Sequence, residues 1–196
     1  TGKHCSRRKV AVTGPAAIET AYIETVPGMP MSALTPFYGV AGGVRIVSGN
    51  VLSGTNEGEQ GYLGFQDCQV TLIQEGTEPE LLGWIRPIRY KQFSTDHCYF
   101  SWLMPWRKYD MNTNLHGGPR AFLMNENYYQ KVLPMDLYPI YLVKACLAGD
   151  IDKMEKFGIY EVLPEDFATV EFVDPSKNNI QSIIASGIDL MLKEMA

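Results

Sequence analysis

The spacing of the apolar residues changes once along the chain, at about residue 135. Before that point, short β-branched runs are broken by glycine, as in VRIVSGNVLSG at 44–54 and CQVTLIQEG at 68–76. After it, apolar residues recur at intervals of three and four between aspartate and glycine breaks, which is the spacing of amphipathic helices. A chain of 196 residues with these two patterns in sequence is predicted to form an α+β protein.

Residues 1–83 are predicted to form a small sheet. Its strands end at glycine-containing turns, the first of them at Gly14-Pro15. One short helix is expected at PMSALTPFYG (30–39), where Ser32 would cap a turn that ends before Pro36. One helix embedded among short strands is typical of a β-grasp arrangement.

Residues 135–196 are predicted to form a small antiparallel helical bundle. Asp136 and Asp150 stand where helix caps are expected, and Gly149 stands where a helix would stop. Pro164 and the acids after it would begin a further segment. These local signals divide the region into four helical pieces.

The last piece is expected to start directly after Asp174-Pro175, with the aspartate as its cap and the proline in its first turn. Its apolar residues fall on one helical face: Ile180, Ile183, Ile184, Ile188, Met191, Leu192 and Met195. Such a stripe predicts packing against the other helices of the bundle along its whole length.

Residues 84–134 are expected to connect the two regions, and they hold all three tryptophans of the chain. From Trp84 to Tyr109 the net charge is +4, whereas residues 135–196 carry −6. Aromatic residues mixed with Lys and Arg can stack bases, contact a protein, lie at a bilayer interface or fill a core between domains. The net charge of the whole chain, −5, argues against nucleic acid. The candidate docking residues are Trp102, Trp106, Arg107 and Lys108.

No motif for catalysis or metal binding occurs in the sequence. The cysteines at 5, 68, 98 and 146 are tens of residues apart, so they predict reduced thiols and no zinc or iron–sulfur site. The glycines of GVAGG (39–43) do not have the spacing of a dinucleotide-binding loop. The three histidines lack a nucleophile motif. We therefore expect no catalytic residue and no metal site in this chain, and no segment is long and apolar enough to span a membrane.

The turn SGNVLSG at 48–54 is the candidate ligand site. Ser48, Gly49 and Gly54 would allow the backbone to approach a small molecule closely. The same glycines would also serve a tight turn that needs positive φ. Both interpretations remain open from the sequence, and the turn is favoured.

Several segments stand in the order that is found in one protein family. They are TGKHCSRRKVAVTGP, VRIVSGNVLSG, GYLGFQDCQVTLIQEG, LLGWIRP, GGPRAFLMNENYYQKVLPMD and LPMDLYPIYLVKACLAGDIDKMEKFGIYEVLPEDFATVEFVDPSK. In these segments the chain resembles the C-terminal region of NqrA, the A subunit of the sodium-translocating NADH:quinone oxidoreductase. The resemblance covers essentially all 196 residues.

The resemblance implies a fragment of a longer protein, an expectation that agrees with a chain starting at Thr1. A barrel-like and a Rossmann-like domain would be missing, and a soluble-ligand-binding (SLBB-like) β-grasp domain and a helical domain would remain. The implied partners are the other subunits of the complex, including membrane subunits, at the cytoplasmic face of the bacterial inner membrane. NADH, flavins and iron–sulfur clusters would belong to other subunits. This portion is expected to bind no cofactor of its own, and a quinone is its candidate ligand.

The family is similar to the flavoprotein of respiratory complex I and to the RnfC protein of the Rnf complex, whose helical domain holds iron–sulfur clusters. Here that domain has one cysteine, Cys146, and a single thiolate cannot hold a cluster. Many relatives carry cysteines where this chain has Val170 and Asp174, while Pro175 is retained. The resemblance therefore implies a helix start without thiol chemistry at Asp174.

Overall fold

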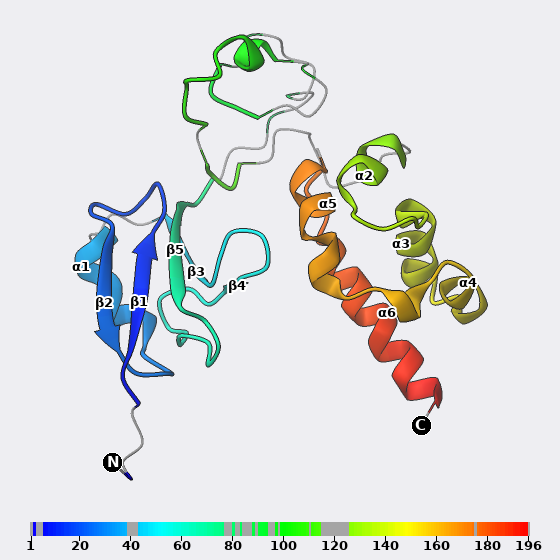
Figure 1. The fold of residues 1–196 in the computed structure, drawn as a ribbon, viewed down its shortest axis with the longest axis horizontal. Coiled ribbons are helices and arrows are strands. Elements are labelled where there is room, and N and C mark those ends of the chain that lie inside the picture. The colour runs from blue at the N-terminus through cyan, green and yellow to red at the C-terminus, as the bar shows by residue number, and fades with distance from the viewer. Residues whose placement is uncertain are drawn as a thin grey trace. The chain divides into compact units, whose positions relative to one another are not determined.

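The computed structural model (Figure 1) describes most of the chain, namely residues 2, 6–38, 43–76, 80, 83, 88, 90–93, 97, 99–109, 111–114, 126–174 and 176–195. The chain forms two compact units. The first unit contains 1–78, 90–92 and 104–114, and the second contains 79–89, 93–103 and 115–196. The segment 84–134 thus contributes stretches to both units.

The first unit is built on a five-stranded sheet in the order β2-β1-β5-β3-β4. Its strands are β1 (Arg8–Thr13), β2 (Ala21–Thr25), β3 (Val44–Ser48), β4 (Thr55–Asn56) and β5 (Gln69–Gln74). β1 and β5 are parallel, and the other neighbours are antiparallel. A mixed sheet of this order, with a helix between β2 and β3, is the β-grasp arrangement that the sequence predicted.

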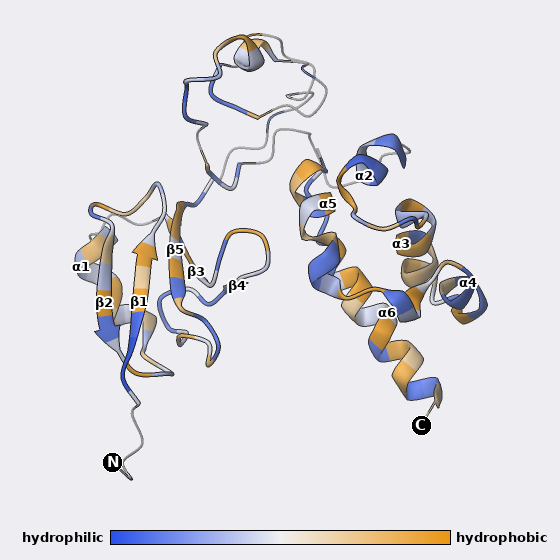
Figure 2. Cartoon of the chain, in the orientation of Figure 1, coloured by the Kyte–Doolittle hydropathy of each residue, from blue (hydrophilic) through white to orange (hydrophobic). Residues whose placement is uncertain are grey.

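The core of this unit lies on one face of the sheet, against the helical segment between β2 and β3. Because β5 is a central strand, residues 70–73 are buried along its length. Fully buried residues come from both layers: Val10, Val12, Met31, Leu34, Ile46, Val70 and Leu72. Figure 2 shows the hydrophobic residues along β1 and β5.

The helical segment of the first unit differs from the prediction at Pro36. A 3-10 turn, η1 (Met31–Leu34), runs directly into α1 (Thr35–Tyr38), and Pro36 is the second residue of α1. The expectation that a turn capped by Ser32 ends before Pro36 was wrong. Proline is tolerated in the first helical turn because its missing N–H would have no helical partner there.

The second unit is helical from residue 126 onward. Its helices are α2 (Glu126–Val132), α3 (Pro139–Ala148), α4 (Ile151–Lys156), α5 (Ala168–Val173) and α6 (Ile180–Met195). Two 3-10 turns, η4 (Ile159–Glu161) and η5 (Pro164–Phe167), join α4 to α5, and a third, η3 (Phe100–Leu103), lies earlier in the chain. The sheet and these helices confirm the α+β class.

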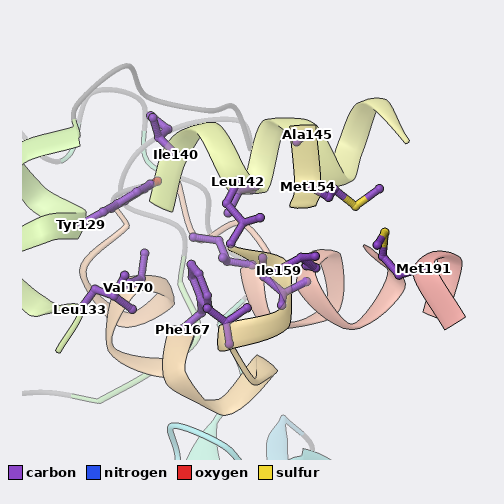
Figure 3. Packing of buried hydrophobic residues seen from close by; sticks show 14 residues of the cluster. Tyr129, Leu133, Ile140, Leu142, Ala145, Met154, Ile159, Phe167, Val170 and Met191 are labelled. Carbon is purple, nitrogen blue, oxygen red and sulfur yellow. The ribbon is translucent and has the colours of Figure 1, made fainter. Parts of the chain in front are cut away.

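One hydrophobic core holds the helices together (Figure 3). Residues from α2, α3, α4, η4, η5, α5 and α6 contribute to it, among them Tyr129, Leu142, Met154, Ile159, Phe167, Val170 and Met191. Along α6, Ile180, Ile184 and Met191 are buried, whereas Leu192 and Met195 are mostly exposed. The predicted stripe therefore packs over most of the helix, and its last turn remains uncovered by the described residues.

The helix boundaries confirm some of the predicted caps. Asp150 caps α4, because its Oδ1 accepts the backbone N–H of Lys153 at 3.1 Å. Gly149 ends α3 in the left-handed conformation with φ +66°. Pro139 occupies the first turn of α3.

Asp136 was wrongly predicted as a cap. The helix begins later, after Tyr138, whose side chain makes no capping hydrogen bond. Oε2 of Glu126, the first residue of α2, accepts the N–H of Ile140 at 3.2 Å instead. Burial is the main reason that the pKa of Glu126 is raised. A side chain from another helix therefore satisfies one of the free amides at this helix start.

Candidate functional site

The candidate docking residues of the first unit lie on a tight turn. The N–H of Arg107 donates to the carbonyl oxygen of Met104 at 3.0 Å, which closes the turn. Trp106 is 78% exposed, and Arg107 and Lys108 are exposed beside it. The Arg107 guanidinium lies 5.8 Å from the ring centroid of Tyr90, a cation–π distance. An aromatic side chain and two cations are thus displayed together at the surface of this unit.

The stretch after this turn is fixed to the end of β5. The backbone of Asn112 bridges to Gln74, and the N–H of Thr113 donates to the Gln74 carbonyl at 3.2 Å. The hydroxyl of Thr113 accepts the N–H of Gly76 at 2.6 Å. It also donates to Glu75 Oε1 at 3.1 Å. The sheet therefore holds the segment that carries the turn.

Glu75 links this anchor to a second strand. Its carboxylate accepts two hydrogen bonds from Arg45 of β3, from Nε at 2.7 Å and from Nη2 at 2.6 Å. The hydrogen bond from Arg45 is the largest reason that the pKa of Glu75 is lowered, and Thr113 lowers it further. A carboxylate that stays ionised keeps both partners, so Arg45, Glu75 and Thr113 form one polar clamp. Sequence reasoning missed it because its members are 30 and 38 residues apart.

Trp102 belongs to the second unit, whereas Trp106, Arg107 and Lys108 belong to the first. It lies on η3, is 50% exposed, and its ring meets the ring of His97 edge to face at 5.3 Å. Phe100 and Leu103 of the same turn are also about half exposed. Of the other aromatic residues in the segment, Trp84 lies outside the described residues.

Ser48, Gly49 and Gly54 are brought together at the end of β3. Gly49 has φ +94°, and a Cβ there would lie 3.2 Å from the Cα of Gly54. A Cβ on Gly54 would lie 2.5 Å from the carbonyl oxygen of Ser48, which no real side chain allows. Both glycines thus satisfy backbone requirements of the turn, and ligand binding at these residues stays a prediction.

The hydroxyl of Ser48 is already engaged within the protein. Ser48 is 1% exposed, and its Oγ donates to Asp67 Oδ2 at 2.5 Å. The same oxygen accepts the N–H of Gly64 at 3.0 Å. Asp67 and Gly64 were not among the predicted site residues, because no local pattern connects them to β3.

Asp174 is the buried polar centre of the helical unit. It is 0% exposed, and its Oδ2 accepts the N–H and the Nδ2–H of Asn178 at 2.8 and 2.9 Å. Its Oδ1 accepts the hydroxyl of Tyr129 at 3.2 Å and the N–H of Ser176 at 3.4 Å. Burial first, and the Asp174 charge second, raise the pKa of Tyr129, which therefore stays a hydrogen donor. This network ties α2 to the loop between α5 and α6.

The expectation that Asp174 caps the last helix was wrong. α6 begins at Ile180, and Asp174 instead ends α5 and organises the loop that follows. Pro175, predicted in the first turn of that helix, lies outside the described residues. Asp174 does accept backbone N–H groups, as a capping aspartate would. These groups belong to the loop after α5, at Ser176 and Asn178, and not to α6.

Within the described ranges, no three His, Cys, Asp or Glu side chains come together as a metal site. Burial raises the pKa of the Cys146 thiol to about 11, so the thiol is protonated at neutral pH. Cys5 and Cys98 lie outside the described residues. None of the helices in the part of the chain that the structure describes has the length and apolar content needed to cross a bilayer.

The chain is similar to known proteins along nearly its whole length. Residues 9–57, from β1 to just past β4, match the family model described as the NQRA C-terminal domain. The chain is 37% identical over 190 residues to NqrA, the A subunit of the Na(+)-translocating NADH-quinone reductase, of Shewanella frigidimarina, covering 96% of this chain and 42% of that protein. The chain is homologous to part of NqrA over nearly its whole length.

Other NqrA relatives match to a similar extent. NqrA of Vibrio anguillarum is 34% identical over 195 residues, which is 99% of this chain and 43% of that protein. NqrA of Yersinia pestis is 37% identical over 177 residues, 90% of this chain and 39% of that protein. The resemblance found in the ordered segments is confirmed, and the chain spans less than half the length of these NqrA relatives.

Proposed function

We propose that this chain is a non-membrane-spanning portion of the NqrA protein of a sodium-translocating NADH:quinone oxidoreductase, and that it docks onto other subunits, including membrane subunits. In such a complex, electrons pass from NADH to quinone while sodium is exported. NADH, flavins and iron–sulfur clusters belong to other subunits, and this portion supplies no catalytic residue. It lies peripherally, at the cytoplasmic face of the bacterial inner membrane.

The observation that carries the docking proposal is the exposed turn with Trp106, Arg107 and Lys108. Tryptophan and arginine are enriched among the residues that dominate binding energy at protein interfaces. The clamp of Arg45, Glu75 and Thr113 anchors the segment after the turn, which reduces the ordering penalty that a partner would meet. Trp102, half exposed on η3, is a separate candidate docking residue on the second unit.

Replacing Trp106 and Arg107 with alanine should weaken capture of the full chain by the other subunits at least tenfold, because a hot spot contributes about 1.4 kcal/mol or more. Co-purification of the tagged subunits with the variant chain measures this effect. Tyr62→Ala is the matched control, since Tyr62 is a 62% exposed aromatic residue of the same unit, outside the turn. Unchanged recovery of the double variant would contradict docking through this turn.

A quinone site at Ser48, Gly49 and Gly54 is the second candidate. It is favoured by the proximity of these residues and by the exposed apolar side chains of Val51 and Leu52 between them. Calorimetric titration of the full chain with a soluble quinone separates this candidate from docking, and a saturable heat is expected if a quinone binds. A flat titration would remove the quinone site and leave the docking proposal intact.

A further inference from the structure

β2 is the outermost strand of the sheet, and no strand in the described part of the chain pairs with its outer edge (Figure 1). Natural proteins usually protect such an edge with lysine, proline or a bulge. The sequence of β2, AYIET, consists mainly of residues that favour strands, and its one charged residue is Glu24. The strand is therefore open to pairing with a further strand.

The pairing of β1 shows which backbone groups of β2 point outward. The N–H of Ala11 donates to the carbonyl of Cys68, directly before β5, at 3.0 Å. The backbone groups of Ala11 thus face β5, and those of its neighbour Val10 face β2, because backbone groups alternate between the two sides of a strand. Val10 lies opposite Ile23, whose N–H and C=O therefore face β1.

By the same alternation, the N–H and C=O groups of Tyr22 and Glu24 point away from the sheet. Within the described residues, these groups have no hydrogen-bond partner. Their residues are separated by one position, which is the spacing of hydrogen-bonded pairs in an antiparallel ladder. The edge thus offers donors and acceptors in the pattern that an incoming antiparallel strand requires.

A second copy of β2 fits this edge in a symmetric register. An antiparallel pair with its two-fold axis at Ile23 places Tyr22 of each copy opposite Glu24 of the other. Every outward N–H and C=O group of these residues then finds a partner. The two Ile23 side chains meet at the axis as a non-hydrogen-bonded pair, in which side chains lie closest.

The side chains at the edge are complementary in the same register. A hollow of about 410 Å³ lies there, lined by Lys9, Tyr22, Ile23 and Glu24. Tyr22 is 82% exposed, and its ring would enter the hollow of the second copy, beside Glu24. Glu24 lies opposite Lys9 in its own sheet, so the two charges of each hollow balance. The two Glu24 side chains are diagonal neighbours and not directly opposite, which limits their repulsion.

We propose that this edge is an interface between two copies of the chain, which join their sheets by antiparallel pairing of β2. The exposed ring and the hollow that receives it belong to the same patch, and a two-fold dimer requires such a self-complementary patch. Two strands of five residues form an interface below the usual size, so we expect a weak dimer with a Kd of about 10–100 μM. The inference does not depend on docking through the turn at Trp106.

Sedimentation velocity of the full chain over a concentration series measures the monomer–dimer equilibrium. Glu24→Pro removes an outward N–H, and an edge strand tolerates proline at such a position. This variant should weaken dimerisation about tenfold or more, because each copy loses a hydrogen bond. Glu24→Ala is the matched control, which loses the same side chain but keeps the N–H, and it should dimerise much more tightly than Glu24→Pro.

Cross-linking tests the register. Ile23→Cys places two thiols at the axis, where the Cα atoms of a non-hydrogen-bonded pair lie about 4.5 Å apart, within the range of a disulfide. Oxidised glutathione should therefore link this variant into a dimer on a non-reducing gel. Tyr22→Cys should link far less, because its diagonal spacing of about 7–8 Å exceeds that range. The parent chain is the control for the natural cysteines.

Several results would overturn the proposal. They are a parent chain that stays monomeric up to about 500 μM, a Glu24→Pro chain that dimerises like the parent, or equal cross-linking of Ile23→Cys and Tyr22→Cys. Thermal unfolding identifies a variant that has lost its fold, and the cross-link at Ile23 decides the question if Glu24→Pro is such a variant. A monomeric parent whose capture by the other subunits is lost in Glu24→Pro would assign the edge to a strand of another subunit, which also overturns pairing between copies.

Discussion

Replacing Asp174 with alanine should lower the free energy of unfolding of the helical unit by about 3–5 kcal/mol, the sum expected when several buried hydrogen-bond donors lose their shared acceptor. The carboxylate is 0% exposed and accepts hydrogen bonds from Tyr129, Ser176 and Asn178. Alanine would remove the acceptor that these buried donors share, and each donor left unsatisfied costs about 1–3 kcal/mol. Denaturant unfolding followed by circular dichroism measures the loss.

Two milder variants test the same network. Tyr129→Phe removes one donor and keeps the ring, so it should lower stability by about 1 kcal/mol, the net value of an ordinary hydrogen bond. Asp174→Asn keeps the size and one acceptor, and should fall between the two. An Asp174→Ala chain within about 1 kcal/mol of the parent, the value of a simple surface cap, would show that the network is not what stabilises this loop.

The second large effect is expected at Gly14, where Gly14→Ala should destabilise the first unit by about 3 kcal/mol or more. Gly14 has φ +115°, and a Cβ there would lie 2.1 Å from the carbonyl oxygen of Leu72 in β5. Backbone strain and overpacking each cost about 1–3 kcal/mol, and both apply at this residue. The obstructing atoms belong to the backbone of a central strand, so the clash cannot be relieved by rotating a side chain.

Gly28→Ala provides the control for this prediction. Gly28 also has positive φ, +76°, but a Cβ there would meet nothing within 4 Å. Its substitution should therefore show only the conformational penalty, about 1 kcal/mol. Equal losses for the two variants in thermal unfolding would show that the contact with β5 does not contribute.

The sequence predicted the elements whose signals are local. Asp150 and Gly149 bound helices as expected because a cap and a stop act within one helical turn. The short strands with one helix among them were enough to indicate the β-grasp arrangement, since alternation and turn residues are read over a few positions. Ser32 does not cap its turn, because η1 begins at Met31 with Pro30 in the N-cap position. Asp136 does not cap α3, because that helix begins after Tyr138 and Glu126 of another helix accepts one of its free amides.

The candidate site was predicted less completely than the fold. Composition indicated Trp106, Arg107 and Lys108 as exposed residues, and the structure places them on a tight, accessible turn. Composition did not indicate the clamp that anchors the stretch after this turn, because Arg45 and Thr113 reach Glu75 from distant parts of the chain. The role of Ser48 in holding Gly64 and Asp67 was hidden for the same reason.

Local patterns along the chain were enough to predict the α+β class, a sheet followed by a helical region, and the similarity to NqrA. The roles of Asp174, Ser48 and Gly14 depend on the folded chain, because the residues that they meet are Tyr129, Asp67 and Leu72. Helix and strand signals arise from neighbours along the chain, whereas burial of a carboxylate or contact between two backbones depends on segments that meet only after folding.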